Sequence, residues 1–461
     1  MTNRTDANLT LAFAEELAAI TPAALTERDL AQLDLLVFDY VGVAYGGAAR
    51  PWIVALHRWA ERYRGTGPAR IIASDLEVTP EVAAFVNGAA GHSFELDDTH
   101  EASMSHPGAV VIPAALAVAS ETGASGRDVL AAIAAGYEAM ARIGIAARAE
   151  RVIAAGHHPT AVFGVFGAVV AAGKLKGFSA QQIAAAWGHA LSLSAGSMQF
   201  SQEVSGAEVK RLHAGYAARA GVLAAEVVEA GIPGPTRGLD GRYGFLALYG
   251  HDAIPEALTR MGARGLAIHD MSFKPYACCR LLHSMIDGLR TTTDGFAQAQ
   301  EARIRAILVR GPRKLAEQHM VRRPDTPMAA QYSLPFTVGA ALAFGPERYD
   351  AYEPGNLADP RILAFADLVE VGHDAAMEAA YPEHFGTEVE VTFADGSTRT
   401  ERVLDSLGTP VHPMTGDALR AKALGLIGGR LEADAFDRLV GEVTALKGAA
   451  DVGPLQAAVA R

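Results

Sequence analysis

The pattern of apolar and polar positions changes along the chain. From the start to about residue 268, apolar residues recur at helical spacing, and many segments are apolar on more than one side. Thr26, Ser125 and Ser179 stand where helix N-caps are expected, the last with Gln182 three residues on. Small residues crowd these segments, which allows helix backbones to approach closely. We therefore expect residues 1–268 to be helical.

The pattern becomes mixed after residue 268. Residues 303–311, RIRAILVRG, alternate and are rich in β-branched side chains, which is typical of a strand. Two alternating runs surround Asp395-Gly396 in residues 387–403, which predicts a hairpin. Helical patterns occupy residues 277–292 and 326–343.

Helical periodicity returns from residue 410 to the end. The sequence therefore predicts a mainly α protein with a smaller domain inserted before the last helices. We expect a large all-helical domain of residues 1–268 and 407–461, and an α+β lid domain of residues 269–406. A cleft between two such parts is a common place for a ligand site.

Composition narrows the possible functions. Half of the 461 residues are hydrophobic and 20% are charged, so the chain can bury a large core and is not intrinsically disordered. The net charge of −12 leaves no basic stripe for phosphates, which argues against nucleic-acid binding. Local cationic groups would have to hold any anionic ligand against the overall field.

Cysteine usage and the chain start suggest the cytoplasm. Cys278 and Cys279 are adjacent, so they support neither a disulfide framework nor a cysteine-rich metal site. The first 20 residues contain acidic side chains and do not resemble a signal peptide. Apolar stretches such as residues 160–173 are shorter than the ~18–20 residues of a membrane span. We expect no membrane association.

The densest group of polar residues lies in residues 91–109, GHSFELDDTHEASMSHPGA. Carboxylates and imidazoles are costly to bury without a partner or a function. A solvated loop that caps a helix is one interpretation, and a hard cation on the carboxylates is another. This group contains Glu95, Asp97, Asp98, Thr99 and His106.

Three titratable or cationic side chains precede a proline that could start a helix. They are His106 before Pro107, His158 before Pro159 and Lys274 before Pro275. A helix N-terminus offers unpaired N–H groups and positive partial charge, both suited to carboxylates. Chance capping chemistry could give the same pattern. Together, the three starts point to a multiply anionic substrate.

Two further features add candidates. In VKRLHAGYAARAG, Lys210 and His213 are three residues apart and share a helix face, either as surface cations or as part of a site. Tyr137 and Tyr332 lie in apolar helical contexts, where a phenol usually forms a hydrogen bond within the core. The chain has no GxxxxGK[ST], no GxSxG and no strand followed by GxGxxG.

Four ordered segments resemble the MmgE/PrpD family. They are NGAAGHSFELDDTH with HPGAVVIPAALA, then GHHPTAVFGVFGA, KRLHAGYAARAG and KPYACCRLLHSMID. The resemblance implies a helical domain with an α+β lid, a homodimer formed through the helical part, and no metal or organic cofactor. Members include 2-methylcitrate dehydratase, cis-aconitate decarboxylase and iminodisuccinate epimerase, which all handle small polycarboxylates.

The resemblance also implies site residues. Two positions depart from the decarboxylase-like pattern: Cys279 stands where those members carry His, and His100 where they tend to carry Trp. Tyr137 would suit the second base of an epimerase. We expect catalytic roles for His106, His158, Lys210, Tyr332 and Tyr137, and substrate binding by Glu95, Asp97, Asp98, Thr99, His213, Lys274 and Cys279.

The expected activity is that of a cofactor-independent lyase of the dehydratase or decarboxylase type. It would act on a small di- or tricarboxylate through proton transfer at a carbon next to a carboxylate. A two-base epimerase is the alternative enzyme, and a non-catalytic polycarboxylate-binding protein is the alternative of another class. A single hollow should gather His106, His158, Lys210 and Lys274 if either enzyme is correct.

Overall fold

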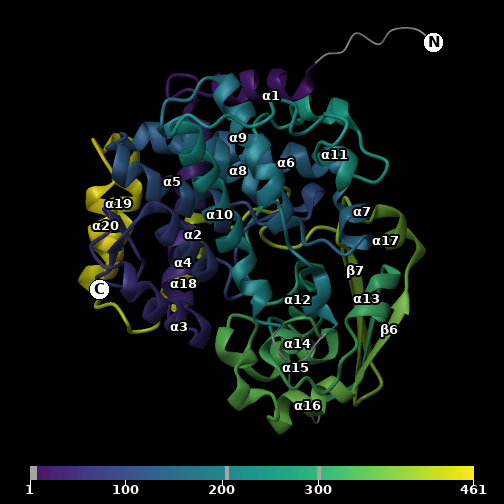
Figure 1. Cartoon of the computed structure of the whole chain (residues 1–461). Coiled ribbons are helices and arrows are strands. Elements are labelled where there is room, and N and C mark those ends of the chain that lie inside the picture. Colours follow the sequence, from purple (N-terminus) through teal and green to yellow (C-terminus); the bar gives the residue numbers. More distant parts are fainter. Residues whose placement is uncertain (1–7, 203–206, 298–302, 461) are drawn as a thin grey trace, which may run out of the picture. The chain divides into compact units, whose positions relative to one another are not determined.

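A computed structural model describes residues 8–202, 207–297 and 303–460 of the chain. The chain divides into two compact units, and helices predominate over small sheets, so the mainly α class is confirmed (Figure 1). The domain boundaries expected after residues 268 and 406 stay a prediction. Unit 1 comprises Met1–Ser93, Asp97–Met271 and Leu426–Arg461, and unit 2 comprises Phe94–Leu96 and Ser272–Gly425.

Unit 1 is built from helices that pack around three central helices, α4, α8 and α10. Helix α10 packs against α4 and α8, and α8 also packs against α5 and α6. The longer helices of unit 1 are α1 (Leu9–Ala18), α2 (Glu27–Gly47), α3 (Pro51–Ala60), α4 (Pro80–Gly91), α5 (Gly108–Thr122), α6 (Gly126–Ala147), α8 (Pro159–Leu175), α9 (Ala180–Leu193), α10 (Val209–Glu229) and α19 (Ala433–Ala445). Short helices α7 (Ala149–Ala154), α11 (Phe245–Leu248) and α20 (Gly453–Val459) complete it.

The predicted capping residues start these helices. Thr26 and Asp29 form a capping box at α2, and Ser179 and Gln182 form another at α9. The Ser125 side chain accepts a hydrogen bond from a backbone N–H in the first turn of α6. Each cap satisfies an N–H group that has no partner within its helix.

Glycines explain how the central helices approach each other. A Cβ at Gly215 of α10 would lie 2.2 Å from the carbonyl oxygen of Phe85 in α4. A Cβ at Gly167 of α8 would lie 2.8 Å from the carbonyl oxygen of Gly136 in α6. Any larger residue would push these helices apart, so the small-residue pattern serves packing, as the sequence indicated.

Helix α6 is apolar over most of its length and is buried in unit 1. Among the helices of the described residues, α6 alone is long and apolar enough to cross a membrane by length and composition. Of its 18-residue window, 94% is buried within the protein, which is the behaviour of a core helix.

A four-stranded sheet in the order β6-β5-β7-β8 forms the strand-containing part of unit 2. The expected strand is β5 (Ile304–Gly311), and the expected hairpin is β7 (Thr387–Phe393) with β8 (Thr398–Val403). Strand β6 (Val369–His373) pairs in parallel with β5 and was not predicted. The helices of unit 2 are α12 (His283–Thr292), α13 (Arg313–Gln318), α14 (Pro327–Gln331), α15 (Leu334–Phe344), α16 (Pro360–Asp367) and α17 (Ala375–Ala380), and α18 (Gly416–Ile427) crosses the unit boundary.

Two helices of unit 2 differ from the sequence expectation. The helix predicted over residues 326–343 is two helices, because Ser333 caps the start of α15 and leaves Tyr332 at the break. No helix starts at Lys274-Pro275, since α12 begins only at His283. The backbone N–H groups of Phe273 and Cys279 donate to Gly408 and Gln331, so tertiary partners replace helical ones.

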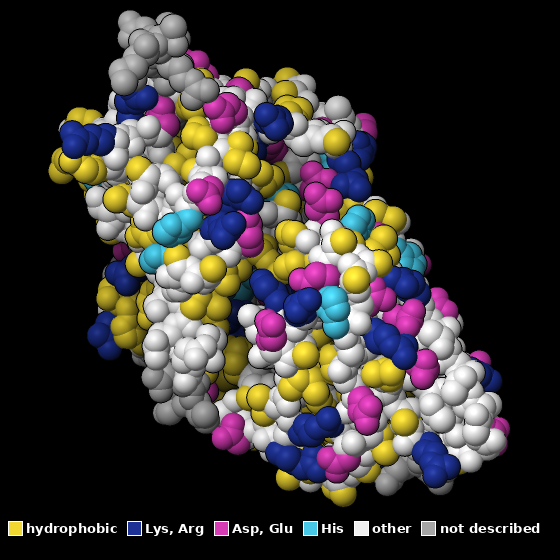
Figure 2. Space-filling view, turned by 90° about the vertical axis from the view of Figure 1, so that its right-hand side faces the viewer, with side chains coloured by type: hydrophobic (Ala, Val, Ile, Leu, Met, Phe, Trp, Pro, Cys, Tyr) yellow, Lys and Arg dark blue, Asp and Glu magenta, His cyan; other side chains and the backbone are white. Residues whose placement is uncertain are grey.

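Cationic and anionic side chains are interspersed on the face of the molecule shown in Figure 2. Blue and magenta groups alternate there across a surface with scattered apolar side chains. A small anion would therefore need a local site rather than a broad positive field.

Candidate functional site

The loop that joins α4 to α5 carries a dense run of buried polar groups. His92 directly follows α4 and is completely buried. Asp97, Asp98 and Thr99 are also buried, whereas the side chain of His106 is 12% exposed. This loop thus places imidazoles and carboxylates in the interior, so the interpretation as a solvated loop is wrong.

Backbone geometry sets the tautomer of His106. Its Nδ1 lies 2.8 Å from the carbonyl oxygen of Asp98 and 3.6 Å from Oδ2 of Asp97. The hydroxyl oxygen of Thr99 lies 3.3 Å from the same Nδ1. Because a carbonyl can only accept, Nδ1 of His106 carries a proton. In the neutral ring, Nε2 is then the nitrogen that can accept a proton.

His92 connects the loop to a second histidine. Its Nδ1 lies 2.6 Å from Oδ2 of Asp97. Its ring centroid lies 5.2 Å from that of His106 and 5.8 Å from that of His158, the N-cap residue of α8. His92 therefore contacts both histidines that the sequence proposed as acid–base groups.

His158 and His213 meet edge to edge. His213 lies on α10, and its Nδ1 is 3.0 Å from Nδ1 of His158. Burial, with help from the neighbouring His213 and Lys210, lowers the pKa of His158 well below its ordinary value. Burial also lowers the pKa of His213 to about 4. Both rings are therefore neutral at pH 7.

Lys210 places a cationic side chain close to this pair. It precedes His213 by one helical turn on α10 and is only 1% exposed. Its charge contributes to the lowered pKa values of both His158 and His213. The expectation that Lys210 and His213 share a face is consistent with this proximity, and the surface-cation alternative is wrong because both are buried.

Asp98 forms the most enclosed carboxyl contact of the loop. Its Oδ1 accepts a 2.9 Å hydrogen bond from the backbone N–H of Gly108 at the start of α5. Its Oδ2 accepts a 2.7 Å hydrogen bond from the hydroxyl of Tyr137 in α6. Burial raises the pKa of Asp98 to about 7, although these hydrogen bonds lower it. Asp98 thus links the loop to two helices.

The same contact argues against Tyr137 as the second base of an epimerase. Burial and the nearby Asp98 raise the pKa of Tyr137 well above 10. A phenol that donates to a carboxyl group and resists ionisation is a poor base. Tyr137 is instead a core hydrogen-bond donor, which was the other interpretation of its apolar context.

Unit 2 contains a separate polar group. Nζ of Lys274 lies 3.5 Å from Oε2 of Glu95, and both side chains are 1% exposed. The Tyr332 hydroxyl donates to the same oxygen at 3.4 Å. Glu95 has a φ of 58°, which is uncommon for a residue other than glycine and often marks functional loops.

The cysteines lie in this unit as well. Cys278 is buried, and burial raises the pKa of its thiol, so a thiolate is disfavoured. Cys279 is partly exposed, and its backbone N–H donates to the carbonyl of Gln331. The expectation that Lys274 stands ahead of a helix N-terminus is wrong, since α12 starts nine residues later.

The predicted site residues belong to both units. Unit 1 holds His106, His158, Lys210, His213, Asp97, Asp98, Thr99 and Tyr137, and unit 2 holds Glu95, Lys274, Tyr332 and Cys279. The sequence interpretation missed His92 and Phe200, whose ring contacts those of His158 and His213. His92 lies within the quoted motif and could have been chosen by its spacing from Asp97, whereas nothing in the sequence marks Phe200.

The arrangement in unit 1 suits proton transfer beside an anion. Neutral imidazoles with lowered pKa values can accept protons, and Lys210 can bind a carboxylate. Within residues 8–202, 207–297 and 303–460, no group of three or more His, Cys, Asp or Glu side chains is placed to hold a metal ion.

Comparisons with known proteins cover nearly the whole chain. The MmgE/PrpD N-terminal domain model matches residues 12–257, and the MmgE/PrpD C-terminal domain model matches residues 276–446. A cis-aconitate decarboxylase-like protein of Aspergillus oryzae is 27% identical, covering 98% of each chain. The cis-aconitate decarboxylase of Aspergillus terreus is 27% identical, covering 91% of this chain and 89% of the relative. That of Mus musculus is 25% identical, covering 90% and 86%.

Proposed function

The chain belongs to the MmgE/PrpD family, and on that premise we propose that it is a lyase that acts on a small di- or tricarboxylate. The reaction proceeds by proton transfer at a carbon next to a carboxylate. One observation carries the proposal: unit 1 holds His106, His92 and His158 in successive ring contact, and the charge of Lys210 acts on His158.

The chemistry requires a base and a stabilising charge. A hydrogen on a carbon next to a carboxylate is weakly acidic, and its removal places negative charge on the carboxylate oxygens. Nε2 of His106 is the basic nitrogen in its neutral tautomer, and Lys210 supplies a buried cation for the developing charge. Burial strengthens such contacts because the local dielectric constant is low.

These groups could serve either of two lyase reactions, which differ in whether the carbon loses or gains a proton. A dehydratase removes the carbon-bound proton and protonates the departing hydroxyl group. A decarboxylase breaks the bond to a carboxylate and delivers a proton to the carbon that remains. His106 and His158 can act as the base and the acid in either case. The relatives named cis-aconitate decarboxylase support the lyase class.

The proposal extends to three residues of unit 2. Glu95, Lys274 and Tyr332 match motifs of the family and are assigned to substrate binding and proton donation. Cys279 differs from the His of decarboxylase-like members, so the proposal is stated for the class of small di- and tricarboxylates rather than for cis-aconitate alone.

The test is incubation of the full chain with cis-aconitate, 2-methylcitrate and iminodisuccinate in D₂O, followed by NMR. A product that has lost a carboxylate or a hydroxyl group, and deuterium on a carbon next to a carboxylate, support the lyase. Deuterium exchange with inversion and no bond loss would replace it with the epimerase. A ligand-induced rise in Tm without any exchange would show a binding protein instead.

A further inference from the structure

His158 and His213 form a direct contact between two imidazole rings, whereas a single acid–base group would require only one ring. The two Nδ1 atoms are 3.0 Å apart, which is hydrogen-bond distance for two nitrogens. Two unprotonated nitrogens, or two protonated ones, would repel each other at that separation. One shared proton must therefore lie between the rings, and each ring keeps its Nε2 on the outer side.

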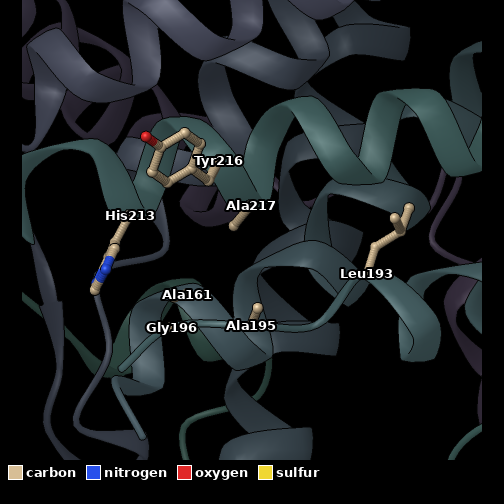
Figure 3. A pocket seen from close by; sticks show the side chains of 7 residues that line it. All are labelled: Ala161, Leu193, Ala195, Gly196, His213, Tyr216 and Ala217. Atoms are coloured by element: carbon tan, nitrogen blue, oxygen red, sulfur yellow. The ribbon is translucent and has the colours of Figure 1, made fainter. Parts of the chain in front are cut away.

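The pair extends from the interior to a pocket in unit 1. His213 lines a pocket of about 190 Å³ together with Ala161, Leu193, Ala195, Gly196, Tyr216 and Ala217. Tyr216 is 45% exposed and Leu193 is 39% exposed, whereas His158 is only 7% exposed. In Figure 3, His213 and Leu193 lie at opposite ends of the view of this pocket.

The pocket wall is also tied to His158 through the backbone. The N–H of His158 donates a 2.9 Å hydrogen bond to the carbonyl oxygen of Gly196. A Cβ at Gly196 would lie 2.3 Å from that of Ala161, so the wall is closely packed at this point. The loop that borders the pocket thus holds the N-terminal end of α8, where His158 lies.

We propose that His213 is a proton-relay partner of His158, and that the pocket is the route by which the pair exchanges protons with solvent. The proposal rests on the proposed acid–base role of His158. A hydronium ion in the pocket gives a proton to Nε2 of His213 and becomes water, and the shared proton passes from Nδ1 of His213 to Nδ1 of His158. His158 then releases its own Nε2 proton to the substrate, so one proton enters the pair and one leaves it.

The groups around His158 disfavour a positive charge on the histidine pair. His92 from the end of α4, His106 from the following loop and Lys210 from α10 all act on His158, and each lowers its pKa when charged. The apolar ring of Phe200 packs against both members of the pair. An extra proton on the pair is therefore short-lived, which a relay requires.

The test removes His213 and offers a replacement. In His213→Ala, we expect kcat for whichever of the three polycarboxylates the protein converts to fall by at least about tenfold, less than the about 10²–10⁴-fold for loss of a group that contacts the substrate. Free imidazole should enter the enlarged pocket and restore kcat. Across substituted imidazoles, the restored rate should vary with the pKa of the added compound, which simple filling of a space would not produce.

Leu193→Ala is the matched control, because it enlarges the same pocket and leaves the histidine pair intact. Its turnover should equal that of the unmodified protein and should not respond to imidazole. An unchanged kcat in His213→Ala, or a folded variant that no imidazole rescues, would overturn the relay.

A second readout separates this proposal from the proposed function. If the unmodified protein converts none of the three polycarboxylates, the lyase proposal fails. In that case ¹⁵N NMR of the histidines still tests whether His158 and His213 share a proton. A through-hydrogen-bond ¹⁵N–¹⁵N coupling between Nδ1 of His158 and Nδ1 of His213, lost in His213→Ala, supports the shared proton. Absence of that coupling in the folded, unmodified protein contradicts it.

Discussion

The hydroxyl of Tyr137 donates a 2.7 Å hydrogen bond to Oδ2 of Asp98, and both residues are buried in unit 1. The carbonyl oxygen of the same Asp98 accepts the hydrogen bond that sets the tautomer of His106. Tyr137 therefore acts on the proposed base through one intervening residue. It is a positioning residue in this proposal, and its effects on stability and on turnover can be measured separately.

Replacement of Tyr137 by Phe should lower the free energy of unfolding by about 1–3 kcal/mol, because the buried Asp98 loses a donor. Urea denaturation followed by circular dichroism measures this change. Tyr40→Phe is the matched control, since the Tyr40 hydroxyl is also buried and donates to the carbonyl of Asn87. Both variants should lose stability, but only Tyr137→Phe should also lower kcat. Equal effects on kcat would contradict the positioning role.

Asp98 should make stability depend on pH. Burial raises its pKa from 3.8 to about 7 in the folded protein, so the folded state binds the proton more tightly than the unfolded state does. Its stabilising contribution is complete below pH 3.8 and is lost as the pH rises toward 7. The loss approaches about 1.4 kcal/mol per pH unit within that window. Urea denaturation across this range gives the slope.

Asp98→Asn isolates the contribution of this one carboxyl group. The amide retains an oxygen that can accept from Gly108 and does not titrate. The stability of the variant should therefore fall less steeply with rising pH than that of the unmodified protein. Parallel curves for the two proteins would show that Asp98 keeps an ordinary pKa.

His106→Asn should lower kcat by about 10²–10⁴-fold, because the variant lacks the basic Nε2. The Asn side chain can still donate to the carbonyl of Asp98, so Tm should stay close to that of the unmodified protein. Initial rates with the converted polycarboxylate and a thermal melt measure both quantities.

His100→Asn serves as the control for a buried histidine in the same loop. Nδ1 of His100 accepts from the backbone N–H of Ser103, and Asn can supply an acceptor there. This variant should keep its turnover. Comparable rate losses at residues 100 and 106 would remove the special role of His106.

Glu95 and Lys274 should behave as a buried ion pair in unit 2. Glu95→Gln and Lys274→Met should each lower the free energy of unfolding by about 3–5 kcal/mol, because each removes the counter-charge of a buried group. The double variant should lose less than the sum, with a coupling of about 0.5–3 kcal/mol. Denaturant unfolding of the four proteins completes the cycle.

The exposed pair Arg323 and Asp367 provides the comparison. Its charged atoms are 2.7 Å apart, but both side chains are about half exposed. Its coupling should be only about 0–1 kcal/mol, since water screens the charges. A coupling for Glu95 and Lys274 no larger than this would show that their contact contributes little.

Local signals in the sequence predicted the starts of several helices and the hairpin. Thr26 and Ser179 cap α2 and α9 with side chains that reach only three residues ahead, and the alternation around Gly396 predicted β7 and β8. These features depend on hydrogen bonds between near neighbours, which the order of residues specifies directly.

Long-range pairing determined the parts that the sequence did not predict. Strand β6 forms because it pairs in parallel with β5, which lies more than fifty residues earlier in the chain. Residues 273–279 are not helical, and the backbone N–H groups of Phe273 and Cys279 donate to the distant residues Gly408 and Gln331. Local periodicity cannot report either outcome, since the hydrogen-bond partners are remote in sequence.

The sequence by itself determined that imidazoles and carboxylates crowd one loop between apolar helices. Only the tertiary structure decided which of them touch. His158 and His213 are 55 residues apart, and the packing of α8 against α10 sets the 3.0 Å separation of their nitrogens. Protonation states follow from that packing, since burial and neighbouring charge shift the pKa of each imidazole away from its ordinary value.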